Sequence, residues 1–152
     1  MKTEFDERTE KNISTLHPKA QAKAREFMAQ AVPLMEQLGA IVKIISGNRT
    51  YAEQDALYAQ GRTKPGRIVT NARAGYSNHN WGTAWDVGVF KDGKYLDESP
   101  LYKSLGKIGQ SLGLEWGGAW ARIVDEPHFE VKTGLTMAEK RERFSSGRDI
   151  FQ

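Results

Sequence analysis

Two histidines and an aspartate form the chain's best candidate for chemistry. The stretch GYSNHNWGTAWDVGV, residues 75–89, contains His79 and Asp86, and His128 follows Pro127 further along. A catalytic zinc ion takes three protein ligands of these types and keeps a fourth position for water. Two neutral imidazoles and one carboxylate leave the ion positively charged, so that it acidifies a water molecule and polarises a carbonyl. His79, Asp86 and His128 are therefore candidate zinc ligands.

Acidic and basic residues near this set could complete a hydrolytic site. In the sequence DEPH, Asp125 and Glu126 precede His128, and either carboxylate could take a proton from the attacking water. Their spacing does not choose between them. Arg49 follows a tight turn at the end of an expected strand and could direct a cation at a developing oxyanion. The alternative is a packed histidine beside an ordinary surface arginine.

Other hydrolytic chemistries have weaker support in the sequence. The H-E-x-x-H zinc signature is absent, and without cysteine there is no thiol nucleophile. A serine triad from Ser77, His79 and Asp86 lacks a nucleophile elbow around the serine. A glycosidase needs a positioned pair of carboxylates, and no pair here has a distinguishing context. Metal-dependent hydrolysis remains the leading interpretation.

The elements expected to position these residues can be read from periodicity and end signals. Helical spacing of apolar residues predicts a helix over 18–38, and IVKII at 41–45 predicts a buried strand. Thr50 and Glu53 have capping-box spacing at the start of a second helix, and residues 62–75 form a long loop. Gly82 can make the bend that brings His79 and Asp86 together.

The second half of the chain continues the alternation of strands and helices. The sequence predicts a strand at 84–90, a hairpin turn at Asp92-Gly93, a helix from Ser99 to about Gly113, a strand at 128–131 and a charged helix beginning at Thr136. This order indicates an α+β fold, a single domain over 1–152 with a small antiparallel sheet flanked by helices.

Composition limits the class of protein. The chain has 152 residues, no cysteine, a mild net charge of +3 and no apolar run long enough to span a bilayer. The charge is far from a nucleic-acid-binding pattern, so neither a nucleic-acid partner nor membrane insertion is expected. The N-terminal segment MKTEFDERTEKN lacks the apolar stretch of a secretory signal, so synthesis in a cytoplasm is expected.

Four motifs in order resemble the M15 zinc peptidases. Ser77, His79, Gly82, Ala84 and Asp86 match the family's S-x-H-x-x-G-x-A-x-D signature, and SGNR is similar to its S-G-x-R. EWGGAW followed by DEPHFE is similar to the W-G-G and D-x-P-H-F-E block of the branch that hydrolyses L-alanyl-D-glutamate bonds. The resemblance spans roughly residues 41–130 and implies a fold like that of hedgehog and D-Ala-D-Ala peptidases.

The resemblance also implies roles for individual residues. It makes His79, Asp86 and His128 the zinc ligands, and it selects Asp125 rather than Glu126 as the acid that moves the proton. It implies that Arg49 binds substrate or stabilises the transition state. Ser77 would then lie beside the substrate. The tryptophans expected to wall the cleft are Trp81, Trp116 and Trp120.

The implied activity is hydrolysis of the L-alanyl-D-glutamate bond in the peptidoglycan stem peptide. We expect a monomeric phage endolysin or close bacterial homologue, without a separate wall-binding module, acting in the periplasm after release from the cytoplasm. One alternative is a D-Ala-D-Ala carboxypeptidase or dipeptidase, whose substrate carboxylate would need Arg62, Lys64 or Arg67. Another is a non-catalytic zinc module that binds the wall.

Overall fold

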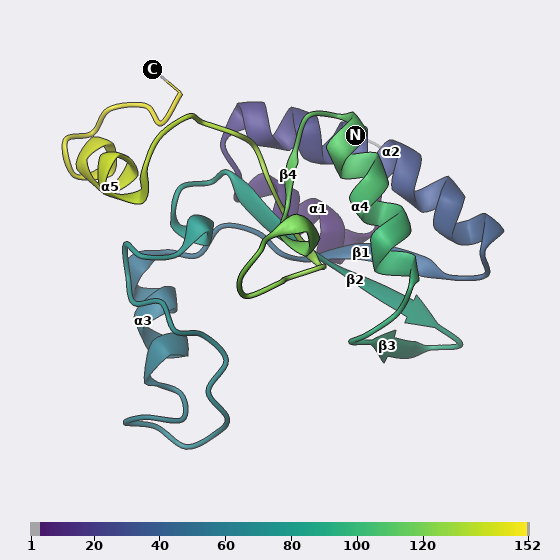
Figure 1. Ribbon diagram of the computed structural model, residues 1–152, viewed down its shortest axis with the longest axis horizontal. Coiled ribbons are helices and arrows are strands. Elements are labelled where there is room, and N and C mark those ends of the chain that lie inside the picture. The colour runs from purple at the N-terminus through teal and green to yellow at the C-terminus, as the bar shows by residue number, and fades with distance from the viewer. Residues whose placement is uncertain (1–3, 152) are drawn as a thin grey trace.

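The computed structural model describes residues 4–151 and shows helices around one antiparallel sheet (Figure 1). Met1–Thr3, the start of the charged N-terminal segment, and Gln152 lie outside the described residues. The helices are α1 (Glu7–Ser14), α2 (Pro18–Gln37), α3 (Tyr51–Ala59), α4 (Leu101–Ser111) and α5 (Met137–Ser145). The strands are β1 (Ile41–Ser46), β2 (Ala84–Lys91), β3 (Lys94–Leu96), β4 (Glu115–Trp116) and β5 (His128–Glu130), with short 3-10 helices η1 (Asn78–Asn80) and η2 (Gly117–Ala119).

The sheet confirms the α+β prediction. Its strand order is β1-β2-β5-β4, with β3 paired to β2, and each pairing is antiparallel. The β2–β3 turn uses Asp92 and Gly93 as expected, both at positive φ, as a tight two-residue hairpin turn requires. Strand β2 therefore lies between β1 and β5, in the interior of the sheet.

One face of β2 makes the hydrophobic core. Because side chains alternate along a strand, Trp85, Val87 and Val89 share a face, and all three are buried in the cluster that includes α2 and α4. Phe27 of α2 packs on Phe129 with ring centroids 4.6 Å apart. Figure 1 shows α2 and α4 running beside each other over the sheet. The opposite face of β2, which carries Asp86, remains available for the site.

Helix ends follow the signals in the sequence. Thr50 and Thr136 both form complete capping boxes, with Glu53 and Glu139 respectively, at the start of α3 and α5. Helix α2 runs continuously through Pro33, so this proline does not split the helix. Within residues 4–151, no helix combines the length and the apolar character needed to cross a membrane.

Helix α1 was not predicted from the sequence. It covers the outer edge of β1, where Thr9 Oγ1 accepts a hydrogen bond from the Ile44 amide and Asn12 donates to the Ile44 carbonyl. These two side chains replace the missing strand partner at the centre of the sheet edge. Part of the contact between this helix and the sheet is polar, so the sequence of the helix lacks the apolar periodicity that would predict it.

Candidate active site

Sheet register brings the first two candidate ligands together. Asp86 on β2 lies directly opposite His128, the first residue of β5, so their side chains project from the same face of the sheet. The next pair, Trp85 and Phe129, faces the hydrophobic core. Alternation along two short strands thus separates a polar site from the apolar interior.

The third candidate ligand comes from the 3-10 turn before β2. The hydroxyl of Ser77 accepts a hydrogen bond from the His79 amide and caps this turn. Gly82 then takes φ +71°, a left-handed conformation that suits glycine, and the chain enters β2. The bend at Gly82 is the one expected from the sequence, and it places His79 beside Asp86.

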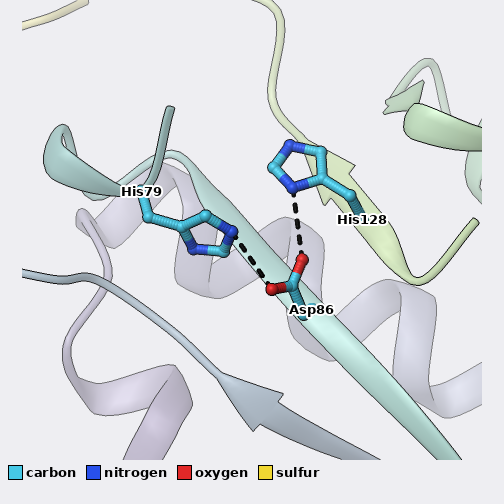
Figure 2. A group of neighbouring side chains, drawn as sticks. All are labelled: His79, Asp86 and His128. Atoms are coloured by element: carbon cyan, nitrogen blue, oxygen red, sulfur yellow. Dashed lines mark hydrogen bonds and ion pairs between the residues drawn. The ribbon is translucent and has the colours of Figure 1, made fainter. Parts of the chain in front are cut away.

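His79, Asp86 and His128 offer ligand atoms that all lie within 4.8 Å of one another. His79 Nε2 lies 3.3 Å from Asp86 Oδ2, and His128 Nδ1 lies 3.2 Å from Asp86 Oδ1. Figure 2 shows the two rings pointing at opposite oxygens of the same carboxylate. The sequence-predicted set therefore converges on one point.

Acceptors behind both rings determine which nitrogen faces that point. His79 Nδ1 lies 2.9 Å from the Gly47 carbonyl, and His128 Nε2 lies 2.7 Å from Glu130 Oε1, so each of these nitrogens donates its proton. In the neutral rings the remaining nitrogens then direct lone pairs toward the Asp86 carboxylate. Lone pairs and a carboxylate repel unless a cation lies between them, so this donor set fits a metal ion such as zinc.

The charged side chains of the site shift one another's pKa values. Burial by itself raises the pKa of Asp86, but the two neighbouring histidines reverse this and lower it well below its usual range. Burial also opposes protonation of His128, whereas hydrogen bonds from its ring to Asp86 and Glu130 raise its pKa to about 9. Protons and a metal ion would therefore compete for the side chains of this site.

Asp125 lies in the same cleft. Burial raises the pKa of its carboxyl group, and the negative charge of Asp86 raises it further. Its amide donates to the Gly117 carbonyl, and its own carbonyl accepts from the His128 amide. A Cβ at Gly117 would come within 2.2 Å of the Asp125 carbonyl oxygen, so only glycine allows this approach. Glu126, the other candidate acid, does not line the cleft.

Arg49 reaches the site from the loop between β1 and α3. Its guanidinium lies 3.7 Å from Asp86 Oδ2 and donates to Gln54 Oε1 at 3.1 Å. Gln54 is fully buried and donates through Nε2 to the Ala72 carbonyl at 2.8 Å. Gln54 of α3 therefore connects Arg49 to the loop that contains Ala72.

A cleft of about 660 Å³ contains these groups. Two loops form its sides, residues 69–72 with 76–78 and residues 120–125. Trp120 lines the cleft as expected, and its ring centroid lies 5.0 Å from that of His128. Ser77 also lines the cleft.

Two expected wall residues lie elsewhere. Trp81 is buried between α3 and α5, where it donates to Met137 Sδ and contacts Phe144, so the structure does not support its place in the cleft wall. Trp116 donates to the Glu126 carbonyl behind the loop. Both indoles support the structure that carries the site, since Trp81 is buried and the partly buried Trp116 packs against the hydrophobic core.

The loop cations that the carboxypeptidase or dipeptidase alternative would need also lie outside the cleft. Arg62, Lys64 and Arg67 do not line the cleft, and the guanidinium of Arg62 is bound to the carbonyls of Tyr58 and Thr70. Among residues 4–151, the arginines and lysines that line the cleft are Arg49 and Arg122. Arg122, Gln54 and Glu130 were not predicted from the sequence. Of the three, only Glu130 could have been found from the sequence. It lies two residues after His128 on a predicted strand, and residues two apart on a strand share a face.

Comparisons with known proteins agree with this geometry. A family model for M15 peptidases, described as D-alanyl-D-alanine carboxypeptidase, matches residues 70–131. The chain is 42% identical over 129 residues to the peptidoglycan L-alanyl-D-glutamate endopeptidase CwlK of Bacillus subtilis (strain 168), covering 78% of this chain and 74% of that protein.

A phage protein and a solved structure are also similar. The chain is 31% identical over 123 residues to the L-alanyl-D-glutamate peptidase of Listeria phage A118, covering 78% of this chain but 39% of the phage protein. Its fold resembles the crystal structure of the Serratia marcescens L-Ala D-Glu endopeptidase ChiX, with a TM-score of 0.59 and 24% identity, covering 86% of this chain and 90% of that one.

Proposed function

Since the chain belongs to the M15 family of metallopeptidases, we propose that it hydrolyses the L-alanyl-D-glutamate bond of peptidoglycan stem peptides in a zinc-dependent reaction. The observation that carries this proposal is the convergence of His79, Asp86 and His128 in a cleft that also contains Asp125 and Arg49. A set of metal ligands alone would suit a binding module. The additional acid and cation are what hydrolysis requires.

His79, Asp86 and His128 would hold the zinc ion on which M15 peptidases depend. When bound, zinc polarises a carbonyl and makes a water molecule acidic enough to act as nucleophile at neutral pH. The Gly47 carbonyl and Glu130 hold the rings in the orientation that this role needs. The protein thus supplies both the ligands and their supports.

The chain's own residues move the proton and stabilise charge. The Asp125 carboxylate takes the proton of the attacking water and later delivers it to the leaving amine. Its raised pKa suits both steps, because the group must hold the proton between them. Arg49 places a fixed cation beside Asp86 at the edge of the cleft, where it binds the oxygen that gains negative charge.

Mass spectrometry of purified muropeptides, with and without a zinc chelator, tests the proposal. The expected result is a set of products that end at L-alanine and form only without chelator. Intact stem peptides in both samples would contradict the enzymatic assignment, and cleavage that persists in chelator would contradict the role of the metal.

A second candidate function is D-Ala-D-Ala carboxypeptidase activity. Two observations favour it: the description of the matching family model, and Arg122 in the cleft, where it could bind a free substrate carboxylate. The same experiment separates the two functions. Release of D-alanine in place of products ending at L-alanine would assign the carboxypeptidase activity.

The biological role that we propose is lysis of a bacterial host by a phage, with the protein made in the cytoplasm and acting on the wall after release. The similarity to the Listeria phage A118 peptidase supports this role. Cytoplasmic expression with and without a pore-forming membrane protein tests it. Lysis only in the presence of the pore is expected, and absence of lysis in both cultures would contradict it.

A further inference from the structure

The C-terminal helix α5 carries a lysine in an unusual environment. Lys140 is only 7% exposed, although lysine is among the residues that proteins bury least. Its Nζ lies 4.0 Å from Glu130 Oε2, and the Glu130 side chain is itself buried. A buried carboxylate is costly without an opposite charge close to it, and the Lys140 ammonium supplies that charge.

Glu130 connects this lysine to the site. Its two carboxylate oxygens have different partners, since Oε2 faces Lys140 and Oε1 accepts from His128 Nε2 at 2.7 Å. The other nitrogen of the His128 ring faces Asp86, as Figure 2 shows. A continuous row of charged and polar groups therefore runs from α5 to the point where the three ligands meet.

We propose that Lys140 is a positioning residue for the metal site: it holds Glu130 in the orientation that fixes the His128 ring, with Nδ1 directed at Asp86 and the point where the three ligands meet. This inference rests on the proposed zinc-dependent function. Without the ammonium, the Glu130 carboxylate would lose the partner of Oε2, and the His128 ring would be held less firmly. Removing a group that hydrogen-bonds directly to a ligating histidine, as Glu130 does, typically lowers metal affinity by about 10- to 100-fold.

Helix α5 has other attachments that would keep it in place if Lys140 were replaced. Arg141 donates to the Gly75 carbonyl at 3.1 Å and lies over the Tyr76 ring at 4.2 Å. Phe144 stacks on Tyr51 with ring centroids 4.8 Å apart. A substitution at Lys140 can therefore test the charge contact without releasing the helix.

The test measures zinc affinity by competition with a chromophoric chelator. Lys140→Met keeps the length of the side chain and removes the charge, so its zinc affinity is expected to fall by about tenfold, the lower end of the range for loss of a direct histidine partner. Lys140→Arg restores a cation and should recover most of the affinity. Arg143→Met, which removes a cation from the same helix with no contact to Glu130, is the matched control and should bind zinc like the wild type. Circular dichroism of the zinc-free variants establishes that each one is folded.

A double-mutant cycle with Glu130→Gln distinguishes positioning through Glu130 from a general effect of α5. If Lys140 acts through Glu130, adding Lys140→Met to Glu130→Gln causes little further loss of affinity. Wild-type zinc affinity in folded Lys140→Met, or losses that simply add, would overturn the proposal. These binding measurements do not involve the peptide substrate. Failure of the wild type to cleave muropeptides would therefore contradict the proposed function and leave the role of Lys140 to be decided by zinc affinity.

Discussion

The side-chain carbonyl of Gln54 accepts a hydrogen bond from the Arg49 guanidinium at 3.1 Å, so a buried residue of α3 fixes the cation at the edge of the cleft. The same side chain donates to the Ala72 carbonyl in the loop that forms one side of the cleft. Gln54 therefore couples the position of Arg49 to the shape of the cleft, although it does not line the cleft itself.

Replacing Gln54 by methionine should impair catalysis. The variant keeps the side-chain volume but removes the acceptor for Arg49 and the donor to Ala72, so we expect kcat/KM to fall by about 10- to 100-fold through misplacement of Arg49. Gln60→Met is the matched control, because Gln60 donates to the Arg67 carbonyl in the same loop without touching Arg49. Equal activities of the two variants would contradict the positioning role of Gln54.

Asp125→Asn should separate metal binding from turnover. Asparagine retains the shape of the side chain but cannot carry the proton, so kcat should fall by at least about 100-fold while zinc remains bound. Metal content of the purified variant and steady-state kinetics on muropeptides measure the two quantities. Glu126→Gln is the comparison, and activity close to that of the wild type is expected. If Glu126→Gln were the inactive variant, the assignment of the acid would be reversed.

Removal of zinc should abolish activity and lower stability. At a free zinc concentration 100 times the dissociation constant, binding to the folded state alone adds about 2.7 kcal/mol to the free energy of unfolding. His79→Ala should lose this stabilisation. His17→Ala should keep it, because His17 lies away from the cleft and pairs with Asp149. Thermal unfolding with and without chelator measures the effect, and identical responses of both variants would argue against His79 as a ligand.

Because of the ion pair between Glu10 and Arg25, the free energy of unfolding should decrease as the pH falls into the acid range. Both carboxylate oxygens bind the guanidinium, at 2.6 and 3.0 Å, and this lowers the pKa of Glu10. A lowered pKa adds stability above the unfolded-state value near 4.5, and this stability is lost as pH falls through the folded-state pKa. Glu10→Gln should thus cost up to about 1 kcal/mol at pH 7 and less at pH 3, measured by urea unfolding. Exposed Glu7→Gln serves as control and should show little difference at either pH.

Arg122→Gln should weaken substrate binding through loss of an exposed cation in the cleft. An exposed ion pair contributes up to about 1 kcal/mol, so KM should rise by roughly fivefold or less, with a smaller effect at high salt. Arg67→Gln, in the neighbouring loop but outside the cleft lining, should leave KM unchanged. A KM for Arg122→Gln that matches the control at low salt would remove Arg122 from substrate recognition.

The sequence predicted most of the fold because its end signals are local. The capping boxes at Thr50 and Thr136 and the turn at Asp92-Gly93 each depend on a few adjacent residues, and all three have the expected conformations. Helix α1 was missed because its contacts with β1 are made by Thr9 and Asn12, which leave little apolar periodicity. The sheet order could not be derived from local signals either, since it depends on which distant strands pair.

Convergence of the three candidate ligands was also predictable, whereas their supports were not. His79, Asp86 and His128 have metal-binding side chains, and their types alone suggest the chemistry. Gln54 and Lys140 belong to residue types common on surfaces, and only their burial in the folded chain marks them. The structure does not support the expectation that Trp81 walls the cleft. A tryptophan close to a site in sequence can equally well pack beneath it, and its residue type does not show which.

The position of β5 between β2 and β4 has a consequence for folding kinetics. Asp86 and His128 are 42 residues apart and meet only when β5, the last strand along the chain, enters the sheet between two strands that precede it. Closing contacts of such long sequence separation is slow compared with forming the local turn at His79. We therefore expect the ligand set to be completed at a late stage of folding. A metal ion that arrives earlier would find only His79 and Asp86. Metal binding should therefore slow unfolding much more than it accelerates folding.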